Sequence, residues 1–125
     1  MSENFTRAGF DRMSELLVDH GPVSVAVGSG SKGLSDSDTG LDQEIYRTSI
    51  NNSNASLNTT SKVGEVEASI SVAGGTEVDP GDSITELGLF LDNGSMMYRT
   101  VRESVEISEG ERLTFTFRFS LVNVE

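Results

Sequence analysis

The clearest hydrophobic pattern of the chain lies near its end. Leu113, Phe115, Phe117, Phe119 and Leu121 alternate with the polar residues between them. Alternation with a period of two is typical of a β-strand that has one buried face. The pattern therefore predicts a strand whose three phenylalanines are buried, each stabilising the fold by roughly 1.5–3 kcal/mol relative to exposure.

The preceding segments repeat this pattern between turn residues. The segment 63–72 would form a strand with four residues on one face, which are Val66, Ala68, Ile70 and Val72. A second strand over 84–91 would have Leu87, Leu89 and Leu91 on one face and Phe90 on the other. The segment 96–101 would form the returning strand. Pro80-Gly81 fits the centre of a type II turn. Asn93-Gly94 predicts a hairpin with a type I′ turn, and 108–111 predict one more turn.

The first twenty residues have helical spacing instead. Phe5, Met13, Leu16 and Leu17 fall near one stripe and Phe10 falls off it, so we expect a helix over 2–20 capped by Ser2. Gly21-Pro22 is a strong helix stop.

Between the helix and residue 62 the pattern is weaker. We expect a short strand over 23–27, a polar loop over 28–40 with the single apolar residue Leu34, and one helical turn over 39–44. A strand of about six residues then begins near Ile45. Residues 51–61 read either as a hairpin tip or as a mobile loop.

These elements predict a mainly β fold: an antiparallel β-sandwich, or a small barrel, of six to seven strands with one N-terminal α-helix. The length of 125 residues favours a single domain over 1–125, with the helix at 2–20 and the sandwich at 23–125.

Charge excludes two classes of partner. The formal net charge is −11, with 20 acidic residues against nine basic ones, of which only Lys32 and Lys62 are lysines. Nucleic acids and anionic membranes are bound by clustered cations, so we expect neither partner. The same composition fits an ordinary acidic protein or one adapted to molar salt, where screening shortens to about 3 Å. The sequence contains no leader pattern, so we expect synthesis in the cytoplasm.

Candidate chemistry is sparse. The chain has no cysteine and one histidine, His20, and we expect no cofactor and no catalytic residue. Gly28 to Gly33 match G-x-G-x-x-G, but no helix pattern follows, so a flexible Gly-Ser loop is the better interpretation. Four carboxylates fall close together and form a weak candidate metal site, although their spacing fails the EF-hand pattern. They are Asp36, Asp38, Asp42 and Glu44.

Two further features leave alternatives open. Glu65 and Glu67 share one strand face. A carboxylate pair could serve glycoside hydrolysis, but an exposed strand face that carries charge to interact with water explains the pair more simply. Asn-x-Ser/Thr triplets begin at five asparagines, and either glycosylation or a chain rich in these residue types accounts for them. They are Asn4, Asn51, Asn54, Asn58 and Asn93.

Two segments resemble small tail-fibre and appendage structural proteins of tailed phages and haloarchaeal tailed viruses. The first is a strand ending in Gly28-x-Gly30, followed by Thr39 with Leu41, and then by Glu44, Tyr46 and Arg47. The second, from Ile84 to Val101, is similar to the hairpin I-T-E-x-G-L-F…G-x-M-x-x-R of phage virion proteins.

The resemblance implies a virion structural protein that acts in assembly and host attachment as a tail-fibre, baseplate or particle-surface component. It implies a homo-oligomer, commonly a trimer, and contacts with other virion proteins. We assign these contacts to Phe10, Met13, Leu16, Met96 and Tyr98, although Met13, Leu16 and Met96 also fit a plain core role. The alternative function is a carbohydrate- or protein-binding β-sandwich module of a halophilic host.

Overall fold

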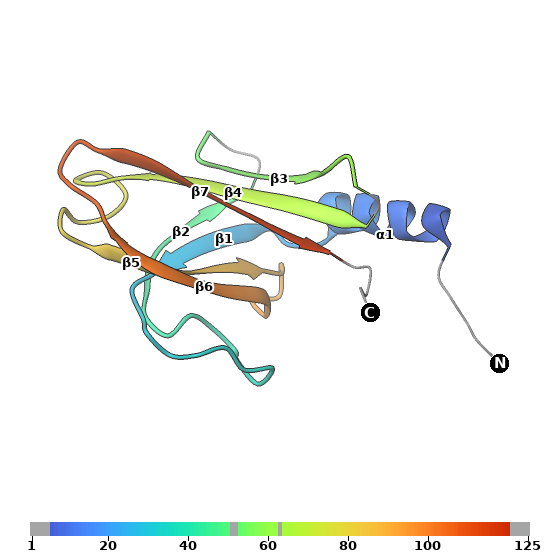
Figure 1. Ribbon diagram of the computed structural model, residues 1–125, viewed down its shortest axis with the longest axis horizontal. Coiled ribbons are helices and arrows are strands. Elements are labelled where there is room, and N and C mark those ends of the chain that lie inside the picture. Colours follow the sequence, from blue (N-terminus) through green and yellow to red (C-terminus); the bar gives the residue numbers. More distant parts are fainter. Residues whose placement is uncertain (1–5, 51–52, 63, 121–125) are drawn as a thin grey trace.

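A computed structural model describes residues 6–50, 53–62 and 64–120. Within these residues one helix precedes seven strands, which form two antiparallel sheets packed face to face (Figure 1). The elements are α1 (Arg7–His20), β1 (Ser24–Gly28), β2 (Glu44–Ser49), β3 (Ala55–Thr59), β4 (Glu65–Ala73), β5 (Ser83–Phe90), β6 (Met96–Glu106) and β7 (Arg112–Ser120). The predicted mainly β fold, consistent with a β-sandwich, is confirmed.

The strand order is β2-β1-β5-β6 in the larger sheet and β3-β4-β7 in the smaller one. Side chains of alternating residues fill the space between the sheets, because successive residues of a strand point to opposite faces. On β4 the apolar residues Val66, Ala68, Ile70 and Val72 are fully buried, as the alternation predicted. Leu87 and Leu89 meet them from β5.

The turns mostly follow the sequence prediction. Gly81 has a φ of +91° and the Asp82 N–H donates to the Asp79 carbonyl, so the type II turn is confirmed. At the β5–β6 hairpin the Gly94 N–H donates to the Leu91 carbonyl, and the Leu91 N–H donates to the Ser95 carbonyl. This pattern is a type I turn with a glycine bulge, one residue earlier than the predicted type I′ turn.

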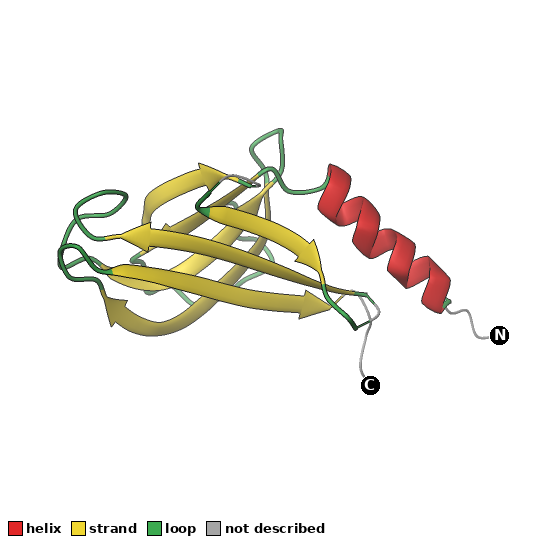
Figure 2. Ribbon diagram, turned by 90° about the horizontal axis from the view of Figure 1, so that it is seen from above, coloured by secondary structure: helices red, strands yellow, loops and turns green. Residues whose placement is uncertain are grey.

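The helix lies at one end of the sandwich, beside the smaller sheet (Figure 2). Its N-cap is Thr6, whose hydroxyl accepts from the Gly9 N–H at 3.1 Å, while the predicted cap Ser2 lies outside the described residues. Ser14 is buried, and Leu17 and Val18 pack against the core. No helix among the described residues is long and apolar enough to cross a membrane.

Two predictions about the middle of the chain were wrong. Residues 51–61 contain strand β3, which the prediction of a hairpin tip or mobile loop missed, because only Ala55 and Leu57 carry its buried face. Residues 39–44 form no helical turn. Their amides bond to a side chain of the larger sheet instead of to one another.

Candidate functional site

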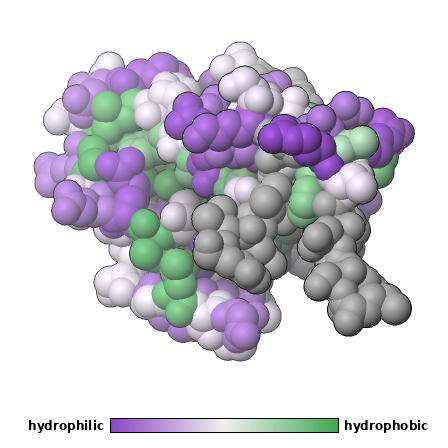
Figure 3. Space-filling view, turned by 45° about the vertical axis from the view of Figure 1, so that its right-hand side comes forward, coloured by the Kyte–Doolittle hydropathy of each residue, from purple (hydrophilic) through white to green (hydrophobic). Residues whose placement is uncertain are grey.

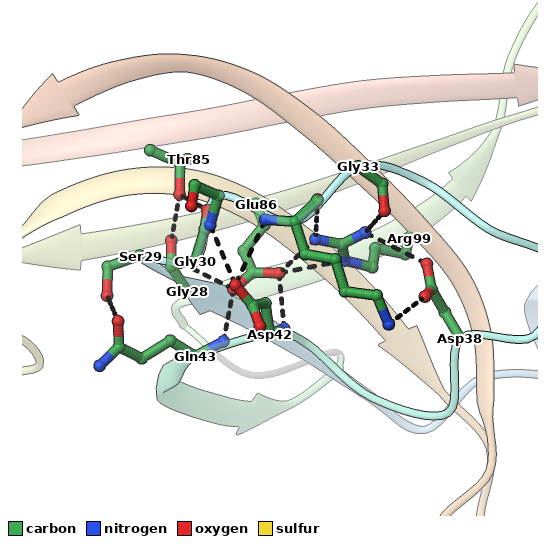
Figure 4. Close-up of polar contacts among 12 residues, drawn as sticks. Gly28, Ser29, Gly30, Gly33, Asp38, Asp42, Gln43, Thr85, Glu86 and Arg99 are labelled. Atoms are coloured by element: carbon green, nitrogen blue, oxygen red, sulfur yellow. Dashed lines mark hydrogen bonds and ion pairs between the residues drawn. The ribbon is translucent and has the colours of Figure 1, made fainter.

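The loop 29–43, which joins β1 to β2, lies across the outer face of the larger sheet. At its centre is Glu86 of β5, whose side chain is fully buried. The Glu86 carboxylate accepts backbone N–H groups from Gly30 at 3.0 Å, Asp42 at 2.9 Å and Gln43 at 2.8 Å (Figure 4). One side chain thus holds both ends of the loop.

Arg99 of the neighbouring strand β6 completes this arrangement. Its Nε donates to Glu86 Oε1 at 3.0 Å, and its other nitrogens donate to the Lys32 carbonyl at 2.8 Å and the Gly33 carbonyl at 3.1 Å (Figure 4). Its Nη1 also bonds Asp38 Oδ2 at 3.1 Å, and Lys32 Nζ lies 3.3 Å from the same carboxylate. We call Glu86, Arg99 and Asp38, together with their bonds to the loop, the clamp.

Both acids of the clamp are held in their charged form. Burial acts to raise the pKa of Glu86, but the backbone amides of Gln43, Asp42 and Gly30 and the Arg99 guanidinium together lower it below its ordinary value. The pKa of Asp38 is lowered by the Ser35 backbone N–H, against the effect of burial, and further by Lys32 and Arg99. Among the described residues no buried side-chain nitrogen or oxygen lacks a partner, which suits the clamp to holding a loop.

The clamp leaves little space beneath the loop. A Cβ atom at Gly30 would come within 2.6 Å of Glu86 Oε2, and one at Gly28 within 2.5 Å of the same oxygen. Leu41 lies over Gly88, where an added Cβ would meet its Cδ2 at 3.0 Å. Gly28 and Gly30 therefore serve close packing, whereas nothing lies within 4 Å of a Cβ added at Gly33. The prediction of a flexible Gly-Ser loop does not extend to the two glycines packed against Glu86.

This packing forms a second buried layer outside the sandwich. Phe90 points away from the inter-sheet core, yet it is only 1% exposed, because the Arg47 guanidinium lies 3.6 Å from the centre of its ring. Ala26 is fully buried on the adjacent strand β1. Strand β1 is thus covered on both faces.

Three of the four carboxylates of the predicted metal site have other partners. Asp38 belongs to the clamp, Asp42 accepts the Ser31 and Lys32 N–H groups, and Glu44 pairs with Arg47 at 2.6 Å. Asp36 is exposed on the loop. Within the described part of the chain, no group of three or more acidic or histidine side chains is placed to hold a metal ion.

The predicted contact residues divide between two places. Met96 and Tyr98 are half-buried and line one cleft of about 450 Å³ beside the loop, together with Leu34, Ser35, Asp36, Asp38, Met97 and Arg99. Phe10, Met13 and Leu16 lie on α1. Phe10 is half-buried on the same side as Ser14 and Leu17, so its predicted position off the packing stripe is wrong, whereas Leu16 is 41% exposed.

Tyr98 also belongs to an aromatic seam between the sheets. Its ring stacks on Phe117 and Phe119 of β7, with centroids 5.6 and 4.8 Å apart, and Arg102 lies over Phe115. Phe115 is buried, but Phe117 and Phe119 are only half-buried, so the prediction of three buried phenylalanines holds for one of them. Because β6 and β7 are edge strands of the two sheets, the seam lies along an open side of the sandwich.

The surface at the helix end shows hydrophobic side chains in separate patches among hydrophilic ones (Figure 3). Within the described part of the chain, the large apolar side chains that are exposed are Leu34, Val23, Leu16 and Val101. These residues come from four different segments, so no one of them defines an interface by itself.

Neither Glu86 nor Arg99 was among the site residues predicted from the sequence. The signal was present, because Glu86 is an acidic residue inside the apolar run ITELGLF and stands on the same strand face as Phe90. No protein-family model matches the sequence, and no curated protein matches it either.

Proposed function

We propose that this chain is a structural subunit of a tailed virus particle, a tail-fibre, baseplate or particle-surface component without catalytic activity. It assembles with copies of itself and with other virion proteins. Its role is to give the particle a stable, repeated surface for assembly and host attachment.

One observation carries the proposal: the two segments that resemble virion proteins meet at the clamp. Gly28 and Gly30 of the first segment lie against Glu86 of the second. Leu41 and Arg47 of the first cover Gly88 and Phe90 of the second. These contacts support treating both segments as one structural motif of the larger sheet.

The character of the site supports the same proposal. The buried polar groups of the clamp are all paired, as expected of an element that holds a loop in place. The acidic surface supports an origin in molar salt, where the repulsion between chains of charge −11 is screened.

The test is size-exclusion chromatography with light scattering at 0.15 M and at about 3 M salt, followed by negative-stain imaging of any assembly. We expect a discrete oligomer that forms or sharpens at high salt. A folded monomer in both buffers, over a wide range of protein concentration, would contradict self-assembly. Ligand screening by thermal stabilisation would then examine the alternative, a carbohydrate- or protein-binding module.

A further inference from the structure

The free edge of β7 differs from the other three sheet edges. Strand β7 pairs with β4 over nine consecutive residues without a register shift, and no described strand pairs with its other side. Proteins ordinarily protect such an edge with proline, a bulge, an inward-pointing charge or a short strand. Strand β7 has none of these features.

The remaining edges are protected. Strand β3 has only five residues, and β2 has six with a register shift opposite its start. Strand β6 pairs with β5 through two register shifts and carries Arg102, Glu103 and Glu106. The edge of β7 is therefore the one best suited to adding a strand.

Two hydrogen bonds of β4 show which backbone groups of β7 point toward its free edge. The Ser71 N–H donates to the Asn54 carbonyl toward β3, whereas the Gly74 N–H donates to the Glu111 carbonyl toward β7. Bonding direction alternates along an antiparallel strand. With the observed register, the amides and carbonyls of Thr114, Thr116 and Arg118 must then point away from β4.

The charge along β7 favours a second copy of this chain as the partner at this edge. Strand β7 contains no acidic residue, and its two arginines are already paired, Arg118 with Glu67 at 2.7 Å and Arg112 with Glu77 at 3.1 Å. In a chain of net charge −11, two copies can approach most easily where the surface charge cancels.

The strand is also complementary to itself. We propose that two copies join through antiparallel pairing of β7 with β7, with Thr116 of one copy opposite Thr116 of the other. This register sets Arg118 opposite Thr114, so no arginine faces another, and on the inner face it sets Phe115 opposite Phe117. The half-buried aromatic seam is thereby extended from one copy to the next.

This inference rests on the proposed function, which requires copies of the chain to associate, and it supplies one contact of that assembly. The contact is two-fold and makes a continuous sheet across both copies. In a trimeric assembly, it joins one trimer to another.

The first experiment uses the absence of cysteine from the chain. Paired residues that exchange hydrogen bonds in an antiparallel ladder have Cα atoms about 5.5 Å apart, within the range of a disulfide. We expect the Thr116→Cys variant to form a cross-linked dimer under mild oxidation at about 3 M salt. The matched control is Thr59→Cys, an exposed threonine on β3 whose backbone also points away from β4. Equal cross-linking of the two variants would overturn the inference.

The second experiment compares Thr116→Pro with Thr59→Pro by light scattering. Proline is tolerated at an edge position whose N–H faces solvent, so both variants should retain the wild-type circular dichroism spectrum. We expect Thr116→Pro to lose the β7 contact, so that its self-association is at least tenfold weaker than that of the wild type. Thr59→Pro should associate as the wild type does.

The outcomes separate this contact from the proposed function. An oligomer that survives Thr116→Pro unchanged would overturn the β7 contact and leave the proposed function standing. A wild-type chain that stays monomeric at both salt concentrations would overturn the contact and contradict the proposed function as well.

Discussion

The clamp and the β7 edge deal with backbone polar groups in opposite ways. At the clamp, two buried charged side chains pair with five backbone groups of the loop 29–43: the amides of Gly30, Asp42 and Gln43 and the carbonyls of Lys32 and Gly33. At β7, the outward amides and carbonyls are left to water or to a partner. Buried charge therefore fixes a loop on the larger sheet, whereas the smaller sheet keeps an edge strand whose outward backbone groups have no strand partner among the described residues.

The largest expected effect comes from breaking the clamp. Arg99→Met leaves the buried Glu86 carboxylate without its cation and two loop carbonyls without a donor. Removing one partner of a buried ion pair costs about 3–5 kcal/mol, so the free energy of unfolding in denaturant should fall by that amount. The control is Arg118→Met, whose exposed pair with Glu67 should contribute under about 1 kcal/mol. Equal losses in the two variants would contradict the role of the clamp.

A smaller effect should follow from adding one methyl group under the loop. In Gly30→Ala the new Cβ would come within 2.3 Å of Asp42 Cβ, and relieving that overlap should cost about 1–3 kcal/mol. The loop should also become sensitive to limited proteolysis. Gly33→Ala is the matched control, because nothing lies within 4 Å of its added Cβ. Resistance of the Gly30→Ala loop to proteolysis would argue against close packing.

Acid should weaken the clamp gradually. The folded-state pKa values of Glu86 and Asp38 lie below their ordinary values of 4.5 and 3.8. Their contribution to stability is therefore fully present above those ordinary values and is lost as the pH falls through the lower folded-state pKa values. Unfolding curves of the wild type and of Glu86→Gln, measured from pH 7 to pH 2.5, should converge toward low pH. A difference in unfolding free energy that stays constant would be evidence against a charged Glu86.

The smallest effect concerns the aromatic seam. Tyr98→Leu removes the one ring that stacks on both Phe117 and Phe119, and it should lower the unfolding free energy by about 0.5–1.5 kcal/mol beyond the effect of the lost apolar area. Tyr98→Phe keeps the stacked ring and should be close to the wild type. A loss in Tyr98→Phe as large as that in Tyr98→Leu would show that the hydroxyl, and not the stacking, matters.

The predicted interface residues show what the sequence cannot distinguish. Phe10 and Leu16 are both large apolar residues of one helix, yet Phe10 is half-buried on the packing side and Leu16 is 41% exposed. In a short helix, the periodicity of apolar residues is compatible with more than one buried face. The packing of α1 against β3 and β4 determines which face is buried. The assignment of contacts to Phe10, Met13, Leu16, Met96 and Tyr98 stays a prediction.

The elements that were predicted correctly are those whose signal lies within a few neighbouring residues. Alternation of apolar and polar residues marked β4 and β7, and alternate leucines marked β5. The pair Pro80-Gly81 marked a type II turn, and Gly21-Pro22 marked the end of the helix. These features depend on side-chain period and backbone preference within a few residues, so a single sequence contains them.

The clamp, strand β3 and the exposure of the aromatic seam depend instead on contacts between segments that are distant in the sequence. Glu86 and the loop amide of Gly30 are 56 residues apart in the chain, and no local period relates a buried glutamate to its donors. Strand β3 forms because its backbone pairs with that of β4. Phe117 and Phe119 are only half-buried because β7 is the last strand of the smaller sheet. Burial and pairing between distant segments are properties of the assembled sandwich, which is why the pattern of polar and apolar residues could not supply them.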